Sequence, residues 1–241
     1  MSLPNRAVLI LLLAGGALAA SAQTKKILVM GSESLARELQ SAVPQAHVVA
    51  VTHANVMQEI VDADGFVGDI RPEEVRAAKQ LKWVQSMSAG VENFLFLSGS
   101  NDLRDSNIVL TNNKIVQGPE IADHAMALLL SLTRRLPRYL AEKPNEALDR
   151  RAFDGIELRG KTAVVVGVGG IGMQIAQRAW AFGMTVYGVD PEDKPLSPFL
   201  QSVVKPDQID EVIPKADVVF ISAPHTPLSH KEMGAHEFDL M

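Results

Sequence analysis

The sequence predicts an α/β protein with two doubly wound, mainly parallel sheets. Short apolar runs with the length of strands alternate with helical patterns along most of the chain. An apolar fraction of 47% and a charged fraction of 21% are typical of a folded globular protein. A length of 241 residues is sufficient for two modest domains, each with its own core.

The first half of the chain repeats a strand-then-helix unit. The apolar run Lys26–Gly31 ends at a glycine turn, and Ser32 can cap the helix predicted over Glu33–Ser41. The same alternation continues through four more strands and two more helices. The strands are predicted at His47–Val51, Gly65–Gly68, Leu81–Ser86 and Ile108–Leu110, and the helices at Asn55–Val61 and Pro72–Gln80.

The longest helical pattern, Pro119–Leu140, is predicted to connect two domains. Apolar residues recur along it at helical spacing, and Arg134, Arg135 and Arg138 lie near its end. These arginines form either a solvated helix end or a contact between subunits. We place the domain boundary near Gly118, which gives an N-terminal domain over residues 23–118 and a second domain over residues 119–241.

Residues 1–22 have the three-part layout of a secretory signal peptide. Arg6 precedes an apolar run shorter than the roughly 20 residues that span a bilayer, and Ala20-Ser21-Ala22 supplies small residues for cleavage. We therefore expect export to the periplasm or the medium and no stable membrane span. The alternatives are a retained anchor or a mis-assigned start codon, and a leader that does not function would leave the protein in the cytoplasm.

Charge and cysteine content exclude several classes of function. A net charge of -5 argues against a protein that coats nucleic acid through phosphate contacts. The sequence has no cysteine, so disulfides, thiolate metal sites and cysteine nucleophiles are excluded. No set of histidine and acidic residues has the spacing of metal ligands, and we expect no metal site.

The segment from Gly167 to Gly172 predicts a dinucleotide-binding loop. Its G-x-G-x-x-G pattern follows the β-branched run Lys161–Val166 and leads into a helix predicted over Ile171–Phe182. Gly167 permits the tight turn, Gly169 leaves room for a pyrophosphate, and Gly172 lets helix and strand approach. The N–H groups at the start of the helix then face the phosphate charge.

Asp190 indicates which dinucleotide binds. It ends the strand predicted over Thr185–Val189 and follows Gly167 by roughly the 20 residues expected of an acid that binds the adenosine ribose. Its charge would repel a 2′-phosphate, and no arginine follows it directly, so NAD is favoured over NADP. A tight turn without a ligand and an S-adenosylmethionine site are the alternatives.

Six segments together resemble the NAD-dependent, D-isomer-specific 2-hydroxyacid dehydrogenases. They occur in the family's order, and the resemblance extends from about Lys26 to the last residue. The segments are Trp83–Glu92, Gly118–Ala125, Leu158–Thr162, Gly167–Gly172, Ala181–Val186 and Ala223–His230.

The resemblance implies a flavodoxin-like N-terminal lobe, a Rossmann NAD-binding lobe and a cleft between them. Backbone N–H groups of Ala89, Gly90 and Val91 are expected to bind the substrate carboxylate. The residues expected to bind the cofactor are Gly167, Gly169, Gly170, Ile171, Gly172, Asp190 and Thr226. A homodimer is expected by the same analogy.

The family's catalytic arginine, glutamate and histidine are expected beyond Met241, so the second lobe is expected to be incomplete. We therefore assign no catalytic residue, and we expect none of the six histidines to be catalytic. The predicted function is an NAD-dependent oxidoreductase that interconverts a 2-keto acid and a D-2-hydroxy acid, with the 241 residues alone inactive. The alternative is a non-catalytic, exported nucleotide- or anion-binding protein with the same fold, which the signal peptide favours.

Overall fold

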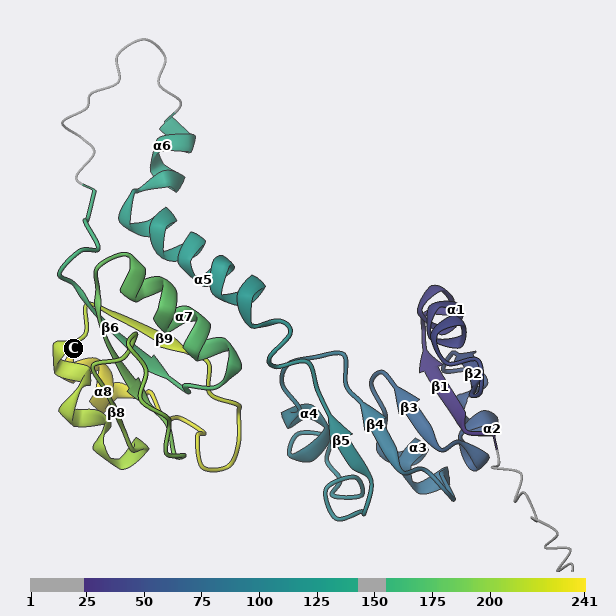
Figure 1. The fold of residues 1–241 in the computed structure, drawn as a ribbon. Coiled ribbons are helices and arrows are strands. Elements are labelled where there is room, and N and C mark those ends of the chain that lie inside the picture. Colours follow the sequence, from purple (N-terminus) through teal and green to yellow (C-terminus); the bar gives the residue numbers. More distant parts are fainter. Residues whose placement is uncertain (1–23, 143–154) are drawn as a thin grey trace, which may run out of the picture.

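The computed structural model describes residues 24–142 and 155–241, which form two α/β units on either side of one long helix (Figure 1). The leader expected at residues 1–22 lies outside the described residues. No helix in the described ranges is both long and apolar enough to cross a membrane. The predicted α/β class with two parallel sheets is confirmed.

The first sheet contains five parallel strands in the order β2-β1-β3-β4-β5. This 2-1-3-4-5 order confirms the flavodoxin-like lobe expected for the N-terminal half. Its strands are β1 (Lys26–Met30), β2 (His47–Val51), β3 (Gly65–Val67), β4 (Trp83–Gln85) and β5 (Val109–Thr111). All five strands are parallel, so their carboxyl ends form one edge of the sheet, and the strand order reverses between β1 and β3, where loops can build a site.

Helices cover both faces of this sheet because its strands are apolar on both sides. Leu28 and Phe66 face one cluster of buried side chains, and their neighbours Val29 and Val67 face another, which α1 covers through Ala36. The helices are α1 (Glu33–Ala42), α2 (Val56–Glu59), the 3₁₀ turn η1 (Ile60–Asp62), α3 (Pro72–Ala77) and α4 (Glu92–Leu95). The Ser32 hydroxyl accepts the Leu35 N–H at 3.2 Å, which confirms the predicted cap.

The helix predicted over Pro72–Gln80 ends earlier than expected, at Ala77. Ala78 has an extended ψ of 121°, although its N–H still donates to Glu74. The next residues turn back toward the sheet, where the Lys79 N–H donates to the Val61 carbonyl at 3.2 Å. The helix is therefore shortened by the return of the chain to β4.

The second sheet has four parallel strands in the order β8-β7-β6-β9. Numbered from β6, this is the 3-2-1-4 order of a Rossmann fold, in which the strand order reverses between β6 and β9. The strands are β6 (Thr162–Val166), β7 (Thr185–Val189), β8 (Ser202–Val204) and β9 (Val218–Ile221). The remaining elements are α7 (Gly170–Ala181), the 3₁₀ turns η3 (Pro206–Glu211) and η4 (Ile213–Lys215), and α8 (Ala235–Leu240).

The helix predicted over Pro119–Leu140 is in fact two helices, α5 (Gly118–Thr133) and α6 (Leu136–Glu142). Pro137 has no N–H, and its ring would collide with the Thr133 carbonyl if one helix continued. The chain breaks at Arg135, whose φ of 53° lies in the left-handed region. Proline is tolerated in the first turn of the new helix, where no partner is needed for its nitrogen.

The helix α5 packs on α7 and contributes to the core of the second sheet. Ala122 and Met126 are buried together with Ile175 of α7 and with inward-facing residues of β6. At the surface, Arg178 donates to the Asp123 carboxylate at 2.6 Å and to the Pro119 carbonyl at 3.3 Å. The boundary near Gly118 stays a prediction.

Candidate functional site

The glycine loop begins with a turn at Gly167 that only glycine fits. Its φ is +86°, and the Gly167 N–H donates to the Val189 carbonyl at 2.8 Å. A Cβ at this position would overlap the backbone of Ala223, which follows β9. The loop therefore lies between the carboxyl ends of β7 and β9, at the point where the strand order reverses.

Gly172 brings the first turn of α7 against this loop. A Cβ at Gly172 would overlap the Gly167 carbonyl oxygen and lie 2.8 Å from the Ser222 hydroxyl. That hydroxyl donates to the Gly167 carbonyl at 2.6 Å. Ser222, which the sequence analysis did not single out, thus ties the loop to the end of β9. The sequence offered no signal for it, because the strand that precedes it, β9, was not predicted.

The space beside Gly169 is open, in contrast to that beside Gly167 and Gly172. Gly169 is exposed, and no atom of the described residues lies within 4 Å of the position that its Cβ would take. It precedes α7, whose first N–H groups, from Gly170 onward, have no acceptor within the helix. Open space in front of a helix N-terminus suits a pyrophosphate.

Gly170 and Ile171 have further contacts. A Cβ at Gly170 would lie 2.8 Å from the Lys114 carbonyl oxygen, so this glycine lets the segment between the two sheets pass close to the loop. The Ile171 side chain packs against the core that α5 and α7 share. Only its backbone N–H is therefore directed by the helix toward the open space.

Asp190 is buried at the end of β7, and its carboxylate binds back to the glycine loop. Its Oδ2 accepts the Val168 N–H at 2.8 Å, and its Oδ1 accepts the Glu192 N–H at 2.9 Å. Lys194 Nζ lies 3.1 Å from Oδ1. Lys194 was not predicted from the residues directly after Asp190, because only the turn of the loop brings it back to the carboxylate.

The charges around Asp190 shift the pKa of two neighbours. Burial raises the pKa of the Glu232 carboxyl, and the nearby charge of Asp190 raises it further. Burial alone would lower the pKa of Lys194, but hydrogen bonds to Glu192 and Asp190 outweigh it and the net pKa is raised. Lys194 is therefore a firmly protonated cation at the edge of the expected ribose site.

In the first sheet, the loop after β4 has an unusual set of free donors. Among the described residues, no hydrogen bond is donated by the backbone N–H of Ala89, Gly90 or Val91. The carbonyls just before and within this loop are occupied. The Ala89 carbonyl accepts the Asn112 side chain at 2.7 Å, and the Met87 carbonyl accepts those of Asn113 and Gln117 at 3.2 and 3.1 Å.

The hydrogen bonds to the Met87 and Ala89 carbonyls hold the loop in place, while the three N–H groups stay unpaired among the described residues. Unpaired backbone N–H groups in a held loop are the arrangement of a backbone anion site. Asn112, Asn113 and Gln117, which make these hydrogen bonds, follow β5. The pairing of β4 with β5 therefore brings them next to the loop. A carboxylate already adjoins it, because the Glu92 side chain lies against Gly90 and its buried Oε2 has no partner among the described residues.

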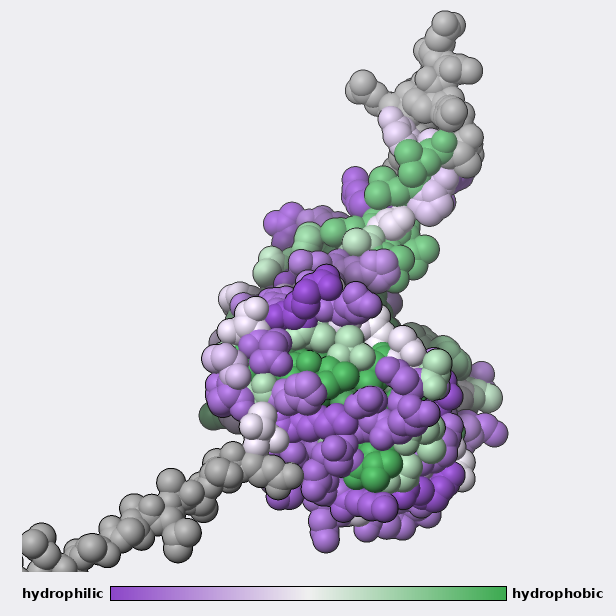
Figure 2. All heavy atoms as spheres, turned by 90° about the vertical axis from the view of Figure 1, so that its right-hand side faces the viewer, coloured by the Kyte–Doolittle hydropathy of each residue, from purple (hydrophilic) through white to green (hydrophobic). Residues whose placement is uncertain are grey.

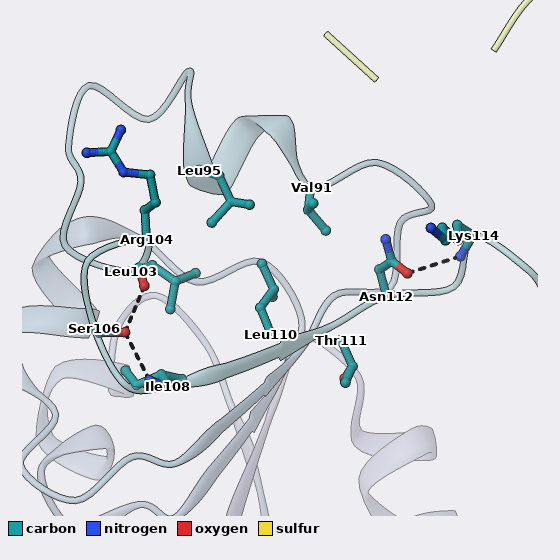
Figure 3. Close-up of a pocket in the computed structure, with 10 residues that line it drawn as sticks. All are labelled: Val91, Leu95, Leu103, Arg104, Ser106, Ile108, Leu110, Thr111, Asn112 and Lys114. Carbon is teal, nitrogen blue, oxygen red and sulfur yellow. Dashed lines mark hydrogen bonds between the residues drawn. The ribbon is translucent and has the colours of Figure 1, made fainter. Parts of the chain in front are cut away.

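A pocket of about 530 Å³ lies beside this loop, between α4 and the exposed edge of β5 (Figure 3). Leu95 of α4 and Leu110 of β5 line it from opposite sides, together with the apolar side chains of Val91 and Leu103. Of Ala89, Gly90 and Val91, only Val91 is among the residues that line this pocket. The pocket is therefore a neighbour of the three free N–H groups and does not enclose them.

Thr226 lies in the loop after β9, but its hydroxyl is already used within a local turn. Its Oγ1 accepts the Ser229 N–H at 3.2 Å, and its own N–H donates to the Ser229 hydroxyl at 2.9 Å. In the same loop the exposed rings of His225 and His230 approach to 3.0 Å. Contact with a cofactor stays a prediction for Thr226.

One cluster of potential metal ligands appears that the spacing in the sequence did not reveal. Ligand atoms of Asp210, His236 and Glu237 lie within 4.8 Å of one another on α8 and η3. The His236 ring already contacts Asp210 at 2.9 Å, and Glu237 accepts the Gly234 N–H at 2.7 Å. The hydrogen bond to Asp210 raises the pKa of His236. These contacts account for the cluster without an ion.

Residues 126–241 match the family model described as D-isomer specific 2-hydroxyacid dehydrogenase, NAD binding domain. The D-3-phosphoglycerate dehydrogenase of Methanocaldococcus jannaschii is 30% identical over 195 residues, which are 79% of this chain and 36% of that protein. The hydroxypyruvate reductase of Thermotoga maritima is 26% identical over 84% of this chain and 60% of its own length.

Solved structures show the same fold. A D-isomer specific 2-hydroxyacid dehydrogenase family protein from Aeromonas salmonicida has a TM-score of 0.70 at 24% identity, over 87% of this chain and 66% of its own. The D-lactate dehydrogenase of Aquifex aeolicus, solved with NAD and lactic acid, has a TM-score of 0.71 at 22% identity, over 89% of this chain and 66% of its own. The chain thus spans between about a third and two thirds of the proteins that it matches.

Proposed function

This chain belongs to the D-isomer-specific 2-hydroxyacid dehydrogenase family, and from that premise we propose that the whole protein interconverts a small 2-keto acid and a D-2-hydroxy acid with NAD(H). The observation that carries the proposal is the row of unpaired N–H groups at Ala89, Gly90 and Val91. These groups follow a strand of one sheet, and an NAD-binding domain is built on the other.

NAD is the cofactor of this domain, and the residues present fit it. Gly169 and the first turn of α7 offer open space and free N–H groups for the pyrophosphate, and Asp190 offers carboxylate oxygens for the adenosine ribose. NAD(H), when bound, accepts or supplies the hydride. The glycine loop holds that cofactor at the carboxyl edge of the sheet, where the strand order reverses between β6 and β9.

The backbone N–H groups of Ala89, Gly90 and Val91 are proposed to hold the carboxylate of the keto or hydroxy acid. Their rigidity comes from Asn112, Asn113 and Gln117, which bind the carbonyls around the loop. A bound anion would exchange solvent for fixed donors, with little reorganisation of the loop. No described residue is assigned the proton transfer.

Enzyme assays test this function. The whole protein is expected to oxidise NADH with glyoxylate, hydroxypyruvate or pyruvate. The 241 residues alone are expected to bind NAD in a calorimetric titration without turnover. Absence of activity in the longer protein would favour the non-catalytic binding protein, and turnover by the 241 residues would place the catalytic groups within them.

We further propose that the protein forms a homodimer through an apolar stripe on α5 and α6. The stripe consists of exposed residues that recur every four or seven positions, and Figure 2 shows apolar side chains along this projecting arm. The residues are Ile121, Leu128, Leu132, Leu136 and Leu140. A stripe that continues across the break between two helices can pair with its own copy about a twofold axis.

Replacing Leu132 by aspartate is expected to convert the dimer into a monomer in light-scattering chromatography. Leu132 is 72% exposed in one chain, so the change should cost little folding free energy while placing a charge in the interface. The control is Leu196→Asp, because Leu196 is fully exposed and lies outside the stripe. A wild-type protein that elutes as a monomer at all concentrations would contradict the proposal.

We also propose that residues 1–22 direct export and are removed. The support is the layout of Arg6, the following apolar run and Ala20-Ser21-Ala22. N-terminal sequencing of protein purified from the producing cells is expected to begin at Gln23. A mature protein that begins at Met1 or Ser2 would contradict export by this leader and favour the cytoplasm.

A further inference from the structure

Both oxygens of the Asp190 carboxylate already have partners. Oδ2 accepts the Val168 N–H, and Oδ1 accepts the Glu192 N–H with Lys194 Nζ 3.1 Å away. A carboxylate oxygen offers about two acceptor positions, so Oδ1 is fully occupied and Oδ2 retains one. A ribose diol that donates two hydrogen bonds to Asp190 can do so only if Lys194 moves.

Lys194 is held at this position more firmly than a typical surface lysine. Its side chain is 15% exposed and also contacts the Glu192 carboxylate at 2.9 Å. Glu192 is 80% exposed, so it can turn into solvent and release the ammonium. The ammonium can then leave Oδ1 and still lie close to Asp190, as a cation with free donors. That is the chemistry that binds a phosphate group.

The other charged groups nearby do not take over this role. Lys205 is occupied by the Pro191 carbonyl at 2.9 Å and the Asp193 carboxylate at 2.6 Å. Glu232 lies near Asp190 and is an acid, and its pKa is raised by burial and by the charge of Asp190, so it offers no positive charge to a phosphate. Lys194 is thus the cation that balances the buried Asp190.

We propose that Lys194 makes the adenosine-ribose end of the site tolerate a 2′-phosphate, so that the protein binds NADP as well as NAD. The inference rests on the proposed position of the cofactor. In a site where Asp190 stood alone, its charge would repel the phosphate. Here the lysine balances that charge and offers its own hydrogen bonds to the 2′-phosphate, which takes the place of one of the two ribose hydroxyls that Asp190 would bind.

The test compares calorimetric titrations of the 241-residue protein with NAD and with NADP. The wild type is expected to bind NADP no more than about tenfold more weakly than NAD. Lys194→Met should weaken NADP by a further factor of about ten or more, because a charge-assisted hydrogen bond is lost, while NAD binding is kept or improved. Lys194→Arg should restore NADP binding.

Lys205→Met is the matched control, because Lys205 follows β8 and contacts the same loop through Pro191 and Asp193, so the change removes a like charge nearby and leaves Asp190 and Lys194 in place. It is expected to leave the ratio of the two dissociation constants unchanged. The proposal is overturned if Lys194→Met does not change that ratio, or if it weakens both cofactors equally, as a purely structural role would. A wild type that binds neither cofactor overturns the proposed cofactor site as well. A wild type that binds NAD but not NADP overturns only the proposed role of Lys194.

Discussion

Replacing Gly172 by alanine is expected to lower the free energy of unfolding by about 3 kcal/mol and to abolish measurable NAD binding. The new Cβ would overlap the Gly167 carbonyl oxygen and crowd the Ser222 hydroxyl. Neither neighbour can withdraw freely, since the hydroxyl is hydrogen-bonded to that same carbonyl at 2.6 Å. The first turn of α7 must therefore move away from the loop, and its N–H groups move with it.

Gly169→Ala is the control that separates folding from binding. No described atom lies within 4 Å of the new methyl group, and the backbone at Gly169 has a φ of -86°, which alanine also adopts. Thermal unfolding of this variant should match the wild type. NAD binding should fall by at least about tenfold if the pyrophosphate lies over Gly169. Wild-type affinity in Gly169→Ala would place the phosphates elsewhere, and wild-type stability in Gly172→Ala would contradict the described packing.

Replacing Asp190 by alanine is expected to have the second largest effect, with a loss of about 2–4 kcal/mol in the free energy of unfolding. The Val168 N–H, which is buried, and the Glu192 N–H would lose their acceptors, and Lys194 would lose the carboxylate that balances its charge. The same variant should bind NAD more weakly, because the ribose hydroxyls would lose their acceptor.

Chemical denaturation and calorimetric titration measure the two effects of Asp190→Ala separately. Asp193→Ala is the matched control, because this carboxylate is 98% exposed and contacts only the exposed Lys205 among the described residues. Its removal should change stability by less than about 1 kcal/mol and leave NAD binding intact. Equal effects of the two substitutions would show that Asp190 has no special place in the site.

Much of the fold could be predicted because it depends on local patterns. The β-branched and apolar runs at His47–Val51 and Thr185–Val189 formed strands with the predicted bounds. In parallel sheets buried on both faces, such runs have few alternatives. The helix break at Arg135 was missed because the apolar spacing continues past Pro137, and the proline's clash with the Thr133 carbonyl outweighs that periodicity.

The candidate site also combines features that the sequence predicted with features that only the tertiary structure shows. The sequence alone determined where a cofactor loop could form, because the positive φ of Gly167 and the close approach at Gly172 each require glycine at that position. Only the tertiary structure decided what surrounds the loop. Ser222 reaches it across the sheet, and Lys194 returns to Asp190 through a turn. The free N–H groups of Ala89, Gly90 and Val91 depend on side chains from the neighbouring strand's loop. Hydrogen bonds and ion pairs between distant segments follow from strand order and loop path, which local sequence patterns do not encode.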